Sequence, residues 1–452
     1  MTPEAKKRLR ERIEQMLDET DKRPQYTIDE LESLLLHIRD EVTEAAREEI
    51  NRELAQQTDQ TEQETPETSS PASKILCPHC QKANAWYKGK RLRQIVTLAG
   101  TLTLLRAYYY CRRCKLGTCP EDSKRSLLLD TNFSTRVEQE VTYLSACLPF
   151  AHAVSTLSRL CGVTVSCASA ERVCRTRGDA LTQAFIKERE EKHLPLAFDA
   201  SPQTLASLPH PEVLYVAADG IQTPLQGGSW KEMKIGVVQS RFRDGRVEQA
   251  SRYVNFLGDC ETFGAKWEAL AISAGSLNAK RVVVLGDGAA WLWNLAQNRF
   301  PRAIQILDFW HALEYVGKVA RDAFGEGSEA GKQWLFCRAC EMKSGDWTSF
   351  QEALESVRSQ AGEAVTDTVR YFGNNRSRMD YARYLKLGLS IGSGIAESSC
   401  KRLVTQRLKG SGMHWSEVGA QAVCSLRCLL LGGEWEDFLA FWNRQKALPS
   451  PL

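Results

Sequence analysis

The sequence predicts a multidomain α+β chain with a helical N-terminal region, a cysteine-rich β ribbon, a second helical segment and an α/β domain interrupted by helices. Three observations carry this prediction. Apolar residues near the N-terminus recur at helical spacing, and four cysteines form two CxxC pairs. Beyond residue 195, buried strands alternate with helices. The length of 452 residues suits about three domains.

Composition excludes some classes of protein. With 43% hydrophobic and 25% charged residues, the chain can bury several cores and is not disordered. No apolar run reaches the roughly 20 residues that cross a bilayer, and the charged N-terminus does not suit a signal peptide. We therefore expect a cytoplasmic protein without a membrane partner. Its 15 cysteines are then expected to be free thiols or metal ligands.

Residues 1–55 are predicted to be helical. Thr27 and Glu30 have the spacing of a capping box, and apolar residues follow with a helical period. A helical hairpin that packs on the body of the chain, or on a second subunit, is the simplest interpretation. Residues 56–73 contain no branched aliphatic or aromatic residue and are predicted to be a flexible linker.

Two CxxC pairs, joined by an alternating β-type segment, predict a zinc ribbon over residues 74–120. Four thiolates can surround Zn²⁺ as a tetrahedron and give a small ribbon the stability that its core cannot supply. His79 and Cys119 are spare ligands, and reduced cysteines without a metal are the alternative. The pair at Cys337 and Cys340 has no second pair nearby and is interpreted as ordinary helix cysteines. The expected ligands are Cys77, Cys80, Cys111 and Cys114.

The net charge of +3 says little about partners, but its distribution does. The ribbon, from Lys74 to Pro120, contains ten Lys and Arg residues and no acid, and the stretch from Ser398 to Ser416 is also free of acids. Such clusters are typical of proteins that bind the phosphate backbone. A purely structural zinc site stays open as an alternative for the ribbon. The candidate DNA contacts there are Lys88, Lys90, Arg91, Arg93, Arg112 and Arg113.

Residues 130–190 are predicted to contain a helix-turn-helix. An apolar helical stripe ends before Gly162, which supplies the turn, and Ser166 is placed to cap the next helix. A generic helical hairpin is the alternative. Arg172, Arg175 and Arg177 would lie on the recognition helix.

From residue 195 the order of elements is β-β-β-α-β-α-β-α, which is the order of an RNase H-like fold. Its first three strands are expected at 213–220, 233–240 and 246–256. Asp219 ends the first strand and Asp287 the fourth, so adjacent strands would bring two carboxylates together, which suits Mg²⁺. Asp199 and Asp308 also end apolar runs and remain rival assignments.

Three segments resemble the catalytic blocks of the ISKra-type insertion-sequence transposases, relatives of the Mutator-like superfamily: AADGIQTP, GDGAAWLWNLAQNRFPRAIQILDFWHALEYV and IGSGIAESSCKRLVTQRLKGSGMHWSEVGAQAVCSLR. The resemblance implies that Asp219, Asp287 and Glu397 are the catalytic acids, and that His311 closes a (C/D)xxH motif. It also implies an RNase H-like core over 195–315 and 389–452, with a helical insertion at 316–388.

The implied activity is that of a DDE transposase, which binds transposon ends and target DNA, then cleaves and transfers strands. Two ions of Mg²⁺ or Mn²⁺ would serve this phosphoryl transfer. Double-stranded DNA is the expected partner, with a homodimer or higher oligomer as the working form and association with the bacterial nucleoid when bound. His311 is expected to orient a carboxylate, to contact DNA or to be structural. The residues expected to contact DNA near Glu397 are Lys401, Arg402, Arg407, Lys409 and Trp415, the last of which would stack on a base or simply pack.

Two rival functions are compatible with the sequence. One is a domesticated zinc-containing protein that binds DNA without catalysis, although such a protein has no need to keep carboxylates beside phosphates. The other is an RNase H-like nuclease that cuts strands without joining them.

Overall fold

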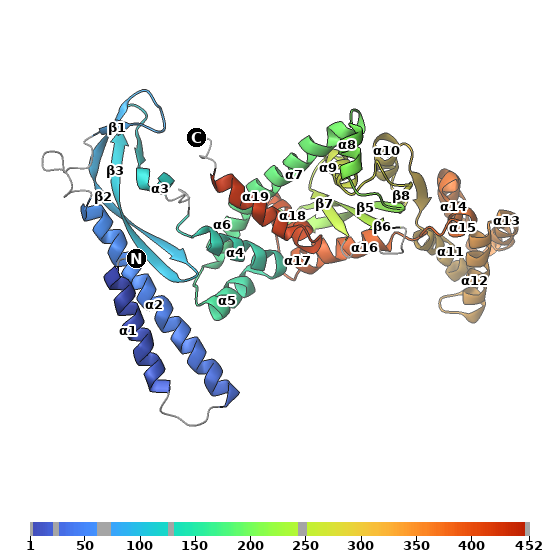
Figure 1. The fold of residues 1–452 in the computed structure, drawn as a ribbon. Helices are drawn as coiled ribbons and strands as arrows, with labels where there is room; N and C mark the ends of the chain where they lie inside the picture. Colours follow the sequence, from blue (N-terminus) through green and yellow to red (C-terminus); the bar gives the residue numbers. More distant parts are fainter. Residues whose placement is uncertain (1–2, 21–26, 61–73, 125–130, 243–250, 448–452) are drawn as a thin grey trace. The chain divides into compact units, whose positions relative to one another are not determined.

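The structure is a computed structural model that describes residues 3–20, 27–60, 74–124, 131–242 and 251–447 (Figure 1). Helices and two β-sheets make up these residues, so the predicted mixed α+β class is confirmed. Within this part of the chain, no helix is both long and apolar enough to span a membrane. The chain forms two compact units: the first contains Met1–Ser145, Pro149–Val173 and Ala440–Leu452, and the second contains Ala146–Leu148 and Cys174–Leu439.

The first unit begins with two helices, α1 (Pro3–Thr20) and α2 (Ile28–Gln60). The predicted capping box is present before α2, because Thr27 N–H donates to Glu30 Oε2 (2.9 Å) and Glu30 N–H donates to Thr27 Oγ1 (3.3 Å). Helix α2 continues to Gln60, so residues 56–60 are helical and the predicted start of the linker is wrong. The rest of the linker, 61–73, lies outside the described residues.

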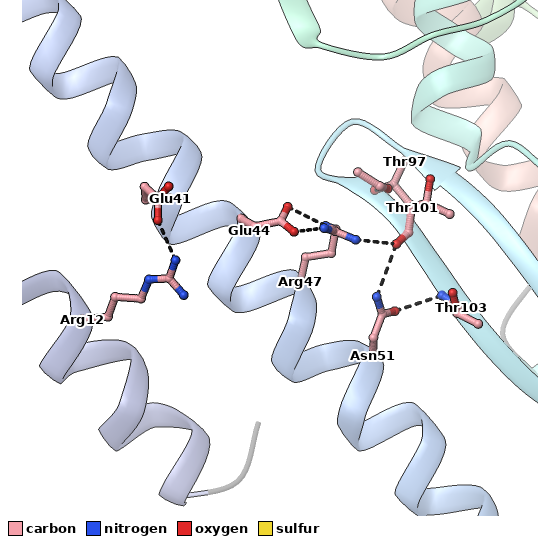
Figure 2. A network of polar contacts seen from close by, with 9 residues as sticks. Arg12, Glu41, Glu44, Arg47, Asn51, Thr97, Thr101 and Thr103 are labelled. Atoms are coloured by element: carbon pink, nitrogen blue, oxygen red, sulfur yellow. Dashed lines mark hydrogen bonds and ion pairs between the residues drawn. The ribbon is translucent and has the colours of Figure 1, made fainter.

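The α2 helix packs on the β ribbon of the same unit (Figure 2). The Arg47 guanidinium donates to the Thr101 carbonyl (3.2 Å), while Asn51 accepts from Thr103 N–H (2.9 Å). On its other side α2 contacts α1, through an ion pair between Arg12 and Glu41 (2.7 Å). Of the two packing partners expected for the helical hairpin, the structure therefore shows contact with the body of the chain.

The ribbon is a four-stranded sheet in the order β1-β2-β3-β4, and all its pairs are antiparallel. A tight turn that ends at Gly100 joins the two long strands. Gly100 has a φ of 96°, which glycine adopts without steric cost. The bounds are β1 (Lys74–Leu76), β2 (Asn84–Thr97), β3 (Gly100–Cys111) and β4 (Leu116–Thr118), followed by α3 (Pro120–Lys124).

A helical segment follows, with α4 (Thr135–Cys147), α5 (Phe150–Cys161) and α6 (Cys167–Val173). Helix α5 ends at Gly162 (φ 68°), and Ser166 Oγ accepts from Ser169 N–H (3.1 Å) at the start of α6. These are the turn and the cap that the sequence predicts. The core of the segment consists of Val137, Val141, Leu157, Val163, Val165, Ala170 and Val173.

The second unit is built on a five-stranded sheet in the order β7-β6-β5-β8-β9. The first three strands in the chain are antiparallel, and the fourth and fifth are added parallel to the first. The bounds are β5 (Val213–Pro224), β6 (Trp230–Arg241), β7 (Arg252–Phe256), β8 (Arg281–Gly286) and β9 (Ile304–Leu307). β5 and β6 are longer than predicted, so Asp219 lies within β5 and the prediction that it ends the first strand is wrong. Residues 246–250 of the expected third strand lie outside the described residues.

Helices connect these strands and precede them. Trp267 and Phe263 of α9 are fully buried against the sheet. The bounds are η1 (a π-helix, Cys174–Gly178), α7 (Asp179–His193), η2 (Leu194–Ala197), α8 (Pro202–Ser207), η3 (Gln226–Gly228), α9 (Cys260–Ser273), α10 (Ala290–Arg299) and α11 (Phe309–Phe324). The region predicted to be a helical insertion contains α12 (Glu329–Ser344), α13 (Trp347–Ser356), α14 (Arg358–Asn375), η4 (Arg376–Arg378) and α15 (Tyr381–Lys386).

The chain then returns to the sheet, where α16 packs on β5 and β6 and α18 packs on β7. A π-helix, η5, follows α16, and the guanidinium of Arg427 donates to the carbonyls of Arg402 and Leu403 within it. Arg427 thereby satisfies carbonyls that a π turn displaces from the α-helical pattern. The bounds are α16 (Gly394–Cys400), η5 (Lys401–Thr405), α17 (Gln406–Leu408), α18 (Glu417–Leu431) and α19 (Trp435–Ala447).

Candidate functional site

Two aspartates lie side by side at one edge of the five-stranded sheet. β5 and β8 pair in parallel, and their last pair is Ala217 and Leu285. Asp219 and Asp287 each follow two residues later in the chain. The two residues therefore stand at the same level on neighbouring strands, and both are half-buried. The Gly220 amide donates to Asp219 Oδ1 (2.7 Å), which fixes the orientation of that carboxylate.

The environment of Asp219 opposes its negative charge. Burial raises the pKa of the Asp219 carboxyl, and the neighbouring charge of Asp287 raises it further, against the opposing effect of the Gly220 amide. Glu232 of β6 adds to the same repulsion. An edge that holds like charges together in this way would be stabilised by a bound cation.

Helix α16 carries Glu397 toward this edge. Cys400, at the C-terminal end of the helix, is buried and hydrogen-bonds the Asp219 carboxyl, so the helix meets β5 at the aspartates. Glu397 lies one turn earlier and is exposed. Among the described residues, the only group of three or more potential ligands within 4.8 Å of one another is a set of four cysteines. The three carboxylates are thus not drawn together at coordination distance.

The two rival aspartates have other roles. Asp199 lies in an exposed loop between η2 and α8, and no strand ends there. Asp308 caps α11, because Oδ1 accepts from His311 N–H (2.8 Å), and its Oδ2 accepts from the amide and the hydroxyl of Ser393. Asp308 therefore anchors the loop that leads into α16.

The side chain of His311 contacts residues of its own helix, α11, and of α14. Its Nδ1 lies 3.3 Å from Glu314 Oε2, and its ring lies edge-on to Tyr315 and Tyr371. The only hydrogen bond between His311 and Asp308 in the described residues is the backbone cap. The contact partners of His311 are therefore consistent with a structural role.

Sequence reasoning missed Tyr371. Its hydroxyl donates to the Asp287 carbonyl, and its ring stacks on Tyr315 at 4.1 Å. Gly288 (φ 101°) makes room for it, because a Cβ there would lie 2.7 Å from the hydroxyl oxygen. Tyr371 belongs to α14, far from Asp287 in the sequence, and no local motif signals this contact. Cys400 was also missed, although its spacing from Glu397 places both on one side of α16.

Three predicted DNA contacts are corrected because their side chains are buried. Arg93 forms an ion pair with the buried Asp122, which also pairs with Arg106. Arg407 is 1% exposed and lies 5.0 Å from the ring of Trp415, and burial lowers its pKa to about 10. Trp415 is 8% exposed, and its indole N–H donates to the Leu408 carbonyl (2.9 Å). Of the two alternatives for Trp415, packing is the one observed.

The other predicted cations remain accessible to different extents. Arg91 lies 3.6 Å over the Tyr108 ring, which holds its guanidinium on the surface of the ribbon. Lys90 and Arg177 are half-buried. The exposed members are Lys88, Arg91, Arg112, Arg113, Arg172, Arg175, Lys401, Arg402 and Lys409.

The four cysteines at the base of the ribbon form the clearest ligand cluster. The sulfurs of Cys77 and Cys114 are 3.6 Å apart, and those of Cys80 and Cys111 are 3.8 Å apart. Four thiolates at about 2.3 Å from a tetrahedral ion would be separated by about 3.8 Å. A hydrogen bond from the Cys114 amide lowers the pKa of Cys111, whereas burial raises the pKa of Cys114. This cluster can hold a metal ion.

Comparison with known proteins places most of the chain in one family. The model of the uncharacterised protein family UPF0236 matches residues 46–440. The chain belongs to the UPF0236 family. A curated relative, the UPF0236 protein in the vanSb 3′ region of Streptococcus gallolyticus, is 21% identical over 360 residues, which cover 76% of this chain and 74% of the relative.

This UPF0236 assignment corrects the family resemblance drawn from the three sequence blocks. The chain is a UPF0236 protein, and its identification with the ISKra-type transposases is wrong. The motifs on which the resemblance depended, Asp-Gly and Gly-Ser-Gly, are not specific to that family, because such strings also occur at turns and helix starts. We call the sheet edge with Asp219, Asp287 and the nearby helix of Glu397 the carboxylate edge. The UPF0236 match covers both the four cysteines and the carboxylate edge, so both lie in the region that the family model describes.

Proposed function

We propose that this UPF0236 protein cleaves DNA and transfers the cut strands, as a transposase does, by metal-dependent phosphoryl transfer at Asp219, Asp287 and Glu397. The observation that carries the proposal is the alignment of Asp219 and Asp287 on neighbouring parallel strands, with α16 packed over β5. A sheet of three antiparallel strands extended by two parallel ones is the pattern of an RNase H-like core, which supports this interpretation.

The chemistry of the carboxylates fits hard divalent ions. The raised pKa of Asp219, caused by burial and by Asp287, indicates a site that gains from added positive charge. When bound, Mg²⁺ or Mn²⁺ would lower the pKa of a water or 3′-hydroxyl nucleophile and offset charge on the leaving oxygen.

The surrounding residues position this site. The Gly220 amide orients Asp219, and the Tyr371 hydroxyl holds the loop of Asp287 through its carbonyl. Asp308 holds the loop before α16 and so determines where Glu397 lies. The exposed Lys401 and Arg402 follow Glu397 by about one turn and are available to bind the scissile strand's phosphates.

DNA binding is assigned to the first unit. We interpret the four-cysteine cluster as a Zn²⁺ site of a zinc ribbon, because thiolates select zinc, and the exposed Arg91, Arg112 and Arg113 as phosphate contacts. The helices α5 and α6, with a turn at Gly162, suit a helix-turn-helix that presents Arg172. Duplex DNA and a homodimer or higher oligomer complete the proposal.

The test uses the full-length protein with labelled duplex DNA in Mg²⁺ or Mn²⁺. We expect strand cleavage and joined products from the wild type, and a loss of at least about a thousandfold in rate from Asp219→Asn, Asp287→Asn and Glu397→Gln, with DNA binding retained. Asp199→Asn is the matched control and should keep full activity. Full activity in Asp219→Asn or Asp287→Asn would refute the proposal, and cleavage without joining would reduce it to a nuclease.

One observation favours a second candidate, a zinc-containing DNA-binding protein without catalysis. The three carboxylates do not lie within 4.8 Å of one another in the described residues, and Glu397 is exposed. Under this alternative, the wild type binds DNA but yields no cleaved product in either metal.

A further inference from the structure

An exposed tryptophan lies beside the carboxylate edge. Trp310 is 60% exposed and follows Asp308 by two residues, at the start of α11. A large aromatic ring that stays exposed to water does not contribute the stabilisation that its burial would give. Its position therefore calls for a reason other than core packing.

The backbone around Trp310 connects it to the site. The Phe309 amide donates to the Ile391 carbonyl (2.8 Å), which joins the start of α11 to the loop before α16. Within that loop, a Cβ on Gly392 would lie 3.0 Å from Cδ1 of Trp310. The indole edge thus lies against the Gly392 backbone, five residues before Glu397.

The indole is held in place on two further sides. The Phe309 ring meets it edge-on at 5.3 Å, and the ammonium of Lys343 from α12 lies 5.5 Å from its ring centre. Lys343 is itself exposed. A fixed aromatic surface with a cation beside it offers both groups that bind a nucleotide, a stacking face for the base and a positive charge for the phosphate.

We propose that Trp310, with Lys343 beside it, stacks on an unpaired nucleobase of the DNA strand that binds at the carboxylate edge. This inference rests on the proposed function, because it names the form of DNA that the site takes. A base inside a duplex is already stacked on its neighbours and has no free face, so the platform would select strands with an unpaired nucleotide next to the reacting phosphate.

The test measures binding to the full-length protein in Ca²⁺. The probe is a DNA strand containing 2-aminopurine, used alone and annealed into a blunt duplex. We expect Trp310→Ala to weaken single-strand binding about tenfold and to abolish the fluorescence quenching of 2-aminopurine. Trp310→Phe should retain most of both, and duplex binding should not change.

The matched control is Phe198→Ala. Phe198 is 92% exposed in the same unit, but it lies with Arg281 and Ile304, the first residues of β8 and β9, at the opposite edge of the sheet. This variant should bind both probes like the wild type.

Three results would overturn the inference, and they separate it from the proposed function. Equal single-strand binding by Trp310→Ala and the wild type, or an equal loss with Phe198→Ala, would remove the stacking role while leaving DNA processing intact. A wild type that binds neither probe would overturn both. Selective loss in Trp310→Ala from a protein that never cleaves DNA would support the stacking role and refute only catalysis.

Discussion

The cysteine cluster and the carboxylate edge are two candidate metal sites built in opposite ways. The cysteines come from two knuckles on one short ribbon, and their sulfurs already lie at the spacing of tetrahedral coordination. The carboxylates come from two strands and a helix far along the chain, and the three do not all lie within 4.8 Å of one another. A closed set of ligands suits a structural ion, whereas an open set leaves room for substrate and water.

The largest effect is expected when the closed site is broken. Replacing Cys77 and Cys80 with Ser should reduce zinc from one ion per chain to none and unfold the ribbon, because binding of structural zinc contributes about 10 kcal/mol or more to folding. Elemental analysis and circular dichroism measure both outcomes. Replacing Cys337 and Cys340 with Ser provides a matched CxxC control on α12 and should leave the zinc in place. Full zinc in the first variant would contradict the ligand set.

The open site depends on an anchor outside the ligand set. Asp308→Ala should lower the free energy of unfolding by about 3 kcal/mol, because it leaves the amide of His311 and the amide and hydroxyl of Ser393 without their buried acceptor. Chemical denaturation measures the change. The exposed Asp199→Ala should stay within about 0.5 kcal/mol of the wild type. Equal effects would show that Asp308 does not anchor the loop before α16.

Burial of the Asp219 carboxyl, together with repulsion from Asp287, gives a pH-dependent effect on stability. The pKa of Asp219 is raised in the folded state, so its ionisation destabilises the fold. This loss of folding stability is absent below the ordinary pKa of 3.8. It grows as the pH rises from there to the raised pKa, and above the raised pKa it is constant. Without metal at pH 7, Asp219→Asn should therefore melt at a higher temperature than the wild type, with the difference vanishing in acid. A lower melting temperature at pH 7 would contradict the repulsion.

The smallest effect separates surface cations from buried ones. Arg91→Ala should weaken DNA binding about threefold and lower the slope of log affinity against log salt by about one. Arg93→Ala should instead destabilise the ribbon, because Arg93 is paired with the buried Asp122. Binding titrations at several salt concentrations and thermal melts distinguish the two. A lower salt slope in a stably folded Arg93→Ala protein would show that Arg93 contacts DNA.

The sequence predicted what is encoded locally. The spacing of Cys77, Cys80, Cys111 and Cys114 is enough to predict their cluster. The apolar runs before Asp219 and Asp287 are enough to place the two aspartates on neighbouring strands. Contacts between segments far apart in the chain could not be predicted from the sequence. One example is the hydrogen bond from the Tyr371 hydroxyl to the Asp287 carbonyl. Burial of single cations was also missed, because Arg407 and Arg93 look like surface charges until Trp415 and Asp122 are brought to them by the fold.

We expect Asp219 and Asp287 together to bind a divalent ion. Electron paramagnetic resonance of Mn²⁺ added to the zinc-loaded full-length protein tests this directly. We predict bound Mn²⁺ in the wild type and its loss in the Asp219→Asn, Asp287→Asn double variant, with the zinc content unchanged. Mn²⁺ bound equally by both proteins, or by neither, would show that the two aspartates do not form a divalent-ion site.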